Sequence, residues 1–155
     1  MQREIHKLIQ RPDFAGDKRV ELAFWQAVRL TDLLRSREIP YHTAETINAQ
    51  ISTINAFPGQ SREITKMIRN FTSSTITLLE KELKLVPKNY YQNQWLAIGM
   101  AAFGIPLGVA FGTSLGNMAY LGIGLPLGLA IGMAVGSGMD KKAATEGRQL
   151  DLDLK

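Results

Sequence analysis

The amino-acid sequence predicts an all-α membrane protein in which a cytoplasmic helical domain precedes a two-helix transmembrane hairpin. Residues 89–139 contain no charged side chain, whereas residues 1–88 carry 14 Lys or Arg and 10 Asp or Glu. Glycine recurs at every fourth position through most of the charge-free part, and apolar residues recur at helical spacing before it. These patterns divide the chain into a cytoplasmic helical domain at 1–88, a hairpin at 89–139 and a polar cytoplasmic tail at 140–155.

Four helices are predicted in the first 88 residues. Pro12, Pro40 and the pair Pro58-Gly59 separate them, because proline and the residue before it disfavour a continuing helix. The expected helices are Gln2–Ile9, Lys18–Arg37, Ala44–Phe57 after a Thr43 cap, and a helix from a Ser61 cap to about Val86.

The last of these helices carries the clearest apolar stripe, and the helix Lys18–Arg37 is expected to supply much of the facing core. The stripe consists of Ile64, Met67, Ile68, Phe71, Thr75, Leu78, Leu79 and either Glu82 or Leu83. The facing residues are Phe24, Trp25, Val28, Leu33 and Leu34. We assign these side chains to the core, and Trp25 has no special role in this interpretation.

Two membrane-spanning helices are expected at about 95–117 and 121–139, since the charge-free stretch is about twice the roughly 20 residues that cross a bilayer. Positive residues flank this stretch and are absent from the turn Asn117–Tyr120, so the positive-inside rule predicts a hairpin in the inner (plasma) membrane with both termini cytoplasmic. The expected membrane-interface residues are Tyr90, Tyr91, Trp95, Tyr120, Lys88, Lys141 and Lys142. Ordinary packing is the alternative role for the aromatic ones.

Each expected span carries a row of glycines four residues apart, and the two rows are related by a repeat of 20 residues. In an antiparallel hairpin that turns at Tyr120, glycines equally distant from the turn face each other, which lets the backbones approach closely. Gly104 then pairs with Gly136, and Gly116 pairs with Gly124. The expected helix-packing residues are Gly104, Gly108, Gly112, Gly116, Gly124, Gly128, Gly132 and Gly136.

A second row of small residues lies two positions away from the glycines, about 200° around each helix. Its members are Ala102, Pro106, Ala110 and Ser114 in the first span and Pro126, Ala130, Ala134 and Gly138 in the second. If the glycines close the hairpin, this second face is free to approach another hairpin, which predicts a homo-oligomer.

A β structure is the competing interpretation, because small and large residues alternate strictly through the glycine-rich part. Pro106 and Pro126 would then remove ladder donors in mid-strand. Membrane helices tolerate proline, and Pro106 is expected to bend the first span. The prolines therefore favour helices.

The repeated glycines of residues 104–136 resemble those of small bacterial glycine-zipper membrane proteins with a two-helix hairpin, and the resemblance covers about residues 95–139. That group includes channel subunits and membrane-active toxins. The hairpin is also similar to the ring-forming subunits of rotary ATP synthases, but those carry a carboxylate in mid-membrane, and no Asp, Glu, Lys, Arg or His lies within 89–139. The comparison therefore does not imply proton-coupled rotation.

Catalytic and metal-binding motifs are missing. The chain has no cysteine, which fits a reducing compartment, and His6 and His42 are its only imidazoles. Without a phosphate loop, a paired-histidine motif or a nucleophile elbow, we expect no enzyme activity, cofactor or metal. Arg62, Lys66 and Arg69 share a helix face that suits anionic headgroups, or is simply solvated, and interspersed acids do not favour nucleic acid.

Two functions follow as expectations, and in both the lipid bilayer is a partner. In the first, oligomerised hairpins form a pore or membrane-perturbing assembly that the cytoplasmic domain controls. In the second, the chain is a non-conducting anchor or scaffold subunit whose domain binds a cytosolic protein. The spans offer only Thr113, Ser114, Asn117 and Ser137 as polar side chains, a thin lining for a conducting path. The tail is expected to be mobile or, at most, a docking strand.

Overall fold

The computed structural model describes residues 4–14 and 16–153 and is mainly helical. The chain forms two compact units. One runs up to Val86 and includes the residues from Leu150 onward, and the other is Pro87–Gln149. The polar tail expected at 140–155 is therefore divided: its first part belongs to the second unit, and the rest returns to the first.

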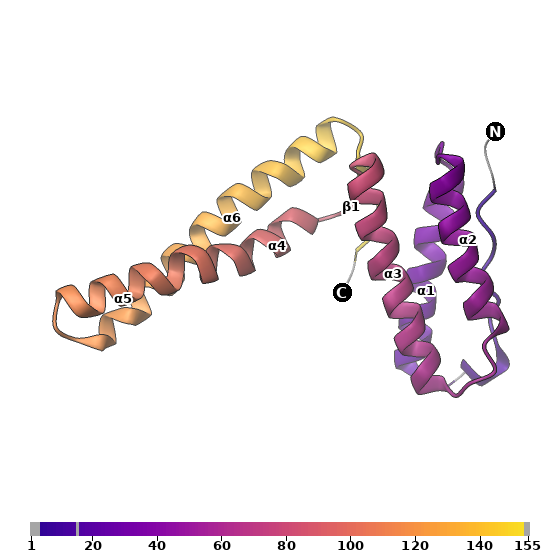
Figure 1. The fold of residues 1–155 in the computed structure, drawn as a ribbon, viewed down its shortest axis with the longest axis horizontal. Coiled ribbons are helices and arrows are strands. Elements are labelled where there is room, and N and C mark those ends of the chain that lie inside the picture. Colours follow the sequence, from indigo (N-terminus) through magenta and orange to yellow (C-terminus); the bar gives the residue numbers. More distant parts are fainter. Residues whose placement is uncertain (1–3, 15, 154–155) are drawn as a thin grey trace. The chain divides into compact units, whose positions relative to one another are not determined.

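Three helices build the first unit, and α3 contacts both of the others (Figure 1). They are α1 (Lys18–Arg35), α2 (Tyr41–Ala56) and α3 (Ser61–Leu83). α2 and α3 begin at or before the residues expected to cap them, so the capping positions are Pro40 and Gln60 rather than Thr43 and Ser61.

Most of the stripe on α3 lies in the core, where Ile64, Ile68, Phe71, Thr75 and Leu79 are buried. The other expected members, Met67, Leu78 and Leu83, are half-buried at its edge.

Trp25 does not belong to the core, because 54% of its surface is exposed. It follows the buried Phe24 on α1 and is rotated from it by about 100° around the helix axis. The buried face of α1 is instead formed by Val20, Ala23, Phe24, Ala27, Leu30, Thr31 and Leu34.

Residues 4–10 are not helical, so the helix predicted over Gln2–Ile9 is wrong across its described part, and residues 2 and 3 lie outside the described residues. The segment buries Ile5 and Leu8 and bonds its backbone to side chains of α1 and α2. These contacts replace the hydrogen bonds that a helix would make internally. A short 3-10 helix, η1 (Pro12–Phe14), follows.

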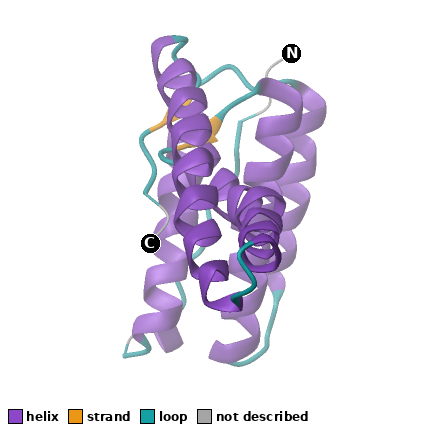
Figure 2. Ribbon diagram, turned by 90° about the vertical axis from the view of Figure 1, so that its left-hand side faces the viewer, coloured by secondary structure: helices purple, strands orange, loops and turns teal. Residues whose placement is uncertain are grey.

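Two short strands, β1 (Val86–Pro87) and β2 (Gln149–Leu150), form a two-stranded sheet (Figure 2). Beyond β2 the chain alternates between the two faces: Leu150 and Leu152 are buried, and Asp151 is exposed. The Leu152 N–H donates to the carbonyl of Leu150 at 2.8 Å, so the chain turns at Asp151 instead of continuing as an extended strand, and the tail docks through its two leucines. Arg29 of α1 donates to Asp151 at 3.0 Å.

Replacing Arg29 by Ala is expected to lower the free energy of unfolding by less than about 1 kcal/mol. The Arg29 and Asp151 side chains are 58% and 62% exposed, so water screens their attraction. Thermal unfolding of the full chain in detergent, followed by circular dichroism, measures the effect. A larger loss would show that charge, rather than burial of Leu150 and Leu152, holds the tail.

The second unit is an antiparallel helical hairpin (Figure 1). Its outgoing arm is continuous and consists of α4 (Tyr90–Gly99), a π-helical turn η2 (Met100–Gly104) and α5 (Ile105–Ser114). A 3-10 turn, η3 (Met118–Tyr120), leads into the returning helix α6 (Leu121–Thr145), which contacts all three parts of the outgoing arm.

Candidate functional site

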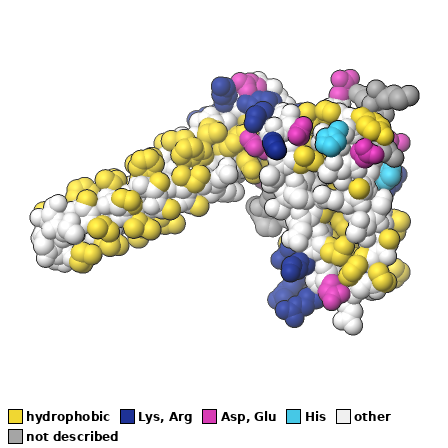
Figure 3. Space-filling view, in the orientation of Figure 1, with side chains coloured by type: hydrophobic (Ala, Val, Ile, Leu, Met, Phe, Trp, Pro, Cys, Tyr) yellow, Lys and Arg dark blue, Asp and Glu magenta, His cyan; other side chains and the backbone are white. Residues whose placement is uncertain are grey.

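Both arms of the hairpin are long and apolar enough to cross a membrane. The continuous helical stretches are Tyr90–Ser114 and Met118–Thr145, and only 22% and 17% of their most apolar windows are buried within the chain. The core helix of a water-soluble protein would bury most of such a window, whereas these apolar side chains face outward. In Figure 3 the visible face of the hairpin carries hydrophobic side chains. Charged side chains appear only at its base, the end at which α4 begins and α6 ends.

Glycines form the contact between the two arms, which is where the sequence places the helix-packing row. Seven of the eight are buried: Gly104, Gly108, Gly112, Gly124, Gly128, Gly132 and Gly136. A Cβ built on Gly128 would lie 2.6 Å from the Cα of Gly104, and one on Gly108 would lie 2.6 Å from the carbonyl oxygen of Leu121. Since no side chain fits between these backbones, the arms approach as closely as small-residue rows permit.

The eighth glycine, Gly116, is in the turn and not in the interface. Its φ is +66°, nothing lies within 4 Å of an added Cβ, and the following Asn117 donates its N–H to the carbonyl of Gly112 at 3.0 Å. This left-handed glycine ends α5 in a Schellman arrangement. The helix therefore stops earlier than the expected span end at residue 117.

Because the chain turns near Gly116 instead of Tyr120, the predicted glycine pairs do not form. Gly104 lies against Gly124 and Gly128 rather than Gly136, and Gly136 lies against Tyr91 and Gln92. The register is thus shifted, although the glycine rows still occupy the contact. Glycine spacing defines a face, while the register depends on where the turn residue takes its left-handed conformation.

The π-helical turn η2 adds Gly99 to the interface, a residue that the four-residue pattern did not include. Ile105 donates its N–H to the carbonyl of Met100, five residues back, immediately before Pro106, which has no N–H to give. The wider turn brings Gly99 onto the same face as Gly104, although five residues separate them. A Cβ on Gly99 would lie 2.8 Å from the Cα of Gly132.

The second row of small residues faces outward. All eight members, from Ala102 to Ser114 and from Pro126 to Gly138, are exposed. Nothing lies within 4 Å of a Cβ added to Gly138. Each arm therefore presents one small-residue face to its partner arm and leaves another uncovered in the single chain.

Asp140 ties the two arms together at the base of the hairpin, a role that the sequence analysis missed. Its carboxylate, on α6, is 6% exposed and accepts the backbone N–H of Tyr91 at 3.1 Å and of Gln92 at 2.9 Å. These are among the N–H groups left unpaired at the start of α4. The residue before α4, Asn89, has a φ of +56° and no capping side-chain bond, so Asp140 is a cap supplied from the other arm.

The aromatic and basic residues expected at a membrane interface lie at the two ends of the hairpin. Tyr90 and Tyr91 begin α4 with ring centroids 5.3 Å apart, and Trp95 contacts Gly132 through its backbone. Lys88, Lys141 and Lys142 are exposed near the same end. Tyr120 is 39% exposed near the opposite end. Tyr91 is buried at the base, where packing explains its position.

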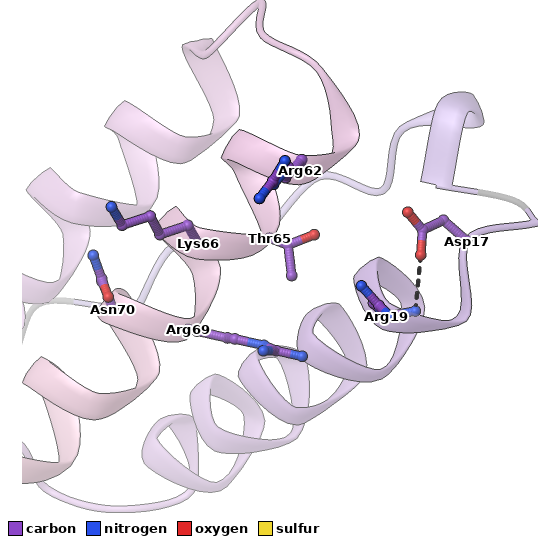
Figure 4. A pocket seen from close by; sticks show the side chains of 7 residues that line it. All are labelled: Asp17, Arg19, Arg62, Thr65, Lys66, Arg69 and Asn70. Carbon is purple, nitrogen blue, oxygen red and sulfur yellow. Dashed lines mark hydrogen bonds between the residues drawn. The ribbon is translucent and has the colours of Figure 1, made fainter.

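A basic pocket of about 680 Å³ lies between the start of α1 and the first turns of α3 (Figure 4). Its lining residues are Asp17, Arg19, Arg62, Thr65, Lys66, Arg69 and Asn70. The carboxylate of Asp17 caps α1 by accepting the N–H of Arg19 at 3.0 Å. Four cations and one carboxylate suit an anion such as a phosphate or a lipid headgroup.

Within the described residues, no group of three or more His, Asp or Glu side chains could hold a metal ion. Comparisons with protein-family models, curated proteins and solved structures find no match to this chain. The hairpin and the first unit are therefore the only basis for a function.

Proposed function

We propose that the chain is an integral membrane protein whose hairpins self-associate into a pore or membrane-perturbing assembly controlled by the first unit. In this proposal the hairpin spans the inner membrane, and both termini face the cytoplasm. α6 has 25 residues, about 37 Å at 1.5 Å per residue, which exceeds the roughly 30 Å hydrocarbon core.

The observation that carries the proposal is the uncovered second row. In lipid, helices associate where small residues let their backbones approach, and the glycine faces are already used within the hairpin. Ala110 and Ala130 are examples of small residues left on an outer face. Contact between such faces on neighbouring hairpins is the association that we propose.

A non-conducting anchor or scaffold is the second candidate, and the geometry of Thr113 favours it. The Thr113 hydroxyl donates to the carbonyl oxygens of its own helix, Val109 at 2.9 Å and Ala110 at 3.1 Å. A hydroxyl bonded in this way contributes little to the polar lining of a water-filled pore. In this candidate the first unit binds a cytosolic protein.

The double variant Ala130→Phe with Ala134→Phe is expected to lower the oligomer mass, because large rings keep the outer faces apart. Light scattering of the protein in detergent or nanodiscs measures the mass, and release of a dye from liposomes measures permeability. The matched control, Val135→Phe, alters an exposed residue about 100° around α6 from Ala134 and about 140° from Ala130, and it is expected to keep the mass.

An unchanged mass in the double variant would show that the outer face is not the interface. For the unmodified protein, a defined oligomer that releases the dye supports the pore. A monomer or dimer in liposomes that retain the dye overturns the pore and supports the anchor.

A further inference from the structure

Residues 4–9 lie along the first unit in the manner of a bound peptide. Asn48 of α2 accepts the N–H of His6 at 2.8 Å and donates to the carbonyl of Glu4 at 2.9 Å, so it brackets Ile5. Seven residues later on α2, Asn55 accepts the N–H of Ile9 and donates to the carbonyl of Lys7, both at 2.9 Å, so it brackets Leu8.

Asn48 and Asn55 each make a pair of hydrogen bonds on either side of one apolar residue, and the spacing of the two pairs along α2 matches their spacing along the segment. Two turns of helix between Asn48 and Asn55 advance about 10.5 Å, and three residues of extended chain between Ile5 and Leu8 advance about 9–10 Å. Asn48 and Asn55 therefore bond to equivalent positions of the segment, around Ile5 and Leu8. A repeat of this kind defines a groove for an extended chain that has an apolar side chain at every third position.

The first helix closes the other side of the groove. Arg35 of α1 donates through Nε to the carbonyl of Ile5 at 2.9 Å and through Nη2 to that of His6 at 2.7 Å. Ile5 is 3% and Leu8 is 9% exposed, whereas their neighbours in the segment are exposed. A cavity of about 220 Å³ remains beside Leu8, lined by Lys7, Val28, Thr31, Asp32 and Arg35 as well.

These contacts select for chain geometry more than for sequence. The six hydrogen bonds from Asn48, Asn55 and Arg35 all go to backbone groups of the segment. Asn48 is 3% exposed, so its amide is preorganised and would lose both partners if the segment left. An empty groove would therefore be costly, and any extended segment with the same two apolar positions would relieve that cost.

We propose that the groove between α1 and α2 is a binding site for extended segments with apolar residues three apart, and that it exchanges its own N-terminal segment for that of a second copy. The same sequence meets the same contacts in either chain, so exchange requires that the chain open ahead of α1. The buried Phe14 and the hydrogen bonds from Arg11 to the carbonyls of Phe57 and Gly59 are then lost in one chain and regained in the other. The exchange rests on the proposed self-association, which gathers copies on one membrane face. Peptide binding by the groove does not depend on that self-association.

A labelled peptide of residues 1–10 tests the groove without a membrane assembly. The host is the full chain in detergent with Ile5→Asp and Leu8→Asp, which weaken its own segment, and circular dichroism checks its helical content. Fluorescence anisotropy is expected to show saturable binding that is at least tenfold tighter than binding to the unmodified chain. Adding Asn48→Ala, which removes two hydrogen bonds, is expected to weaken binding about tenfold.

A peptide in which Ile5 and Leu8 are both Asp is the matched control and is expected not to bind. Equal binding of the two peptides, or no binding to a folded host, overturns the groove as a peptide site.

Single cysteines test the exchange in copies that keep an intact segment, since the chain has no cysteine of its own. One tagged copy carries Lys7→Cys and the other carries Asp32→Cys, at positions that line the same cavity. After co-reconstitution in liposomes, a short bismaleimide is expected to link the two tags at least fivefold more than it links Lys7→Cys to Lys66→Cys on α3. Equal linking of the two pairs overturns the exchange, even where the peptide binds.

Discussion

Replacing Gly128 by Leu is expected to separate the two arms of the hairpin and to cost about 3 kcal/mol or more of its stability. The Cβ alone would lie 2.6 Å from the Cα and N of Gly104 and from the carbonyl oxygen of Gly99. These are backbone atoms of a helix, so they cannot move aside as a side chain can. The greater helix propensity of Leu, worth about 1 kcal/mol over Gly, does not offset this clash.

Thermal unfolding in detergent measures the loss, and a cysteine pair placed on the two arms reports their separation. Gly122→Leu is the matched control on the same helix, because nothing lies within 4 Å of its added Cβ. We expect it to leave the closed hairpin intact. Gly112→Leu is expected to have an intermediate effect, because its nearest neighbour is the flexible side chain of Met118, at 3.0 Å. Equal stability of the Gly128 and Gly122 variants would contradict the observed register.

The sequence was sufficient to predict helices in both units and the face by which the two arms meet. Long-range periodicity carries this information: the stripe through Ile64 and Leu79 and the glycines from Gly104 to Gly136 repeat at helical spacing. Such patterns report which side of a helix is covered. They do not report which residue lies opposite.

Features that depend on one residue's backbone conformation or on a distant partner were not predictable. The left-handed Gly116 fixes the register, and the π-helical turn before Pro106 adds Gly99 to the interface. The N-terminal segment was predicted to be a helix that ends before Pro12. Its conformation is determined instead by amide side chains more than forty residues away, which no local pattern reveals.

Removing the Asp140 carboxylate is expected to weaken the base of the hairpin by about 2 kcal/mol in an Asp140→Ala variant. The N–H groups of Tyr91 and Gln92 would then lose their acceptor in a largely buried position. Asp140→Asn keeps one carbonyl oxygen but turns an amide donor toward the second N–H, so its loss is expected to lie between those of the unmodified chain and the Ala variant. Thermal unfolding in detergent measures both losses.

Hydrogen exchange of the two amides distinguishes a lost cap from general destabilisation. Tyr91 and Gln92 are expected to exchange faster in Asp140→Ala, while amides in the middle of α6 keep their protection. Lys141→Ala is the control, because this exposed side chain follows Asp140 directly on the same helix. If the two amides stayed protected in Asp140→Ala, α4 would have another acceptor, and the carboxylate would not be the group that joins the arms.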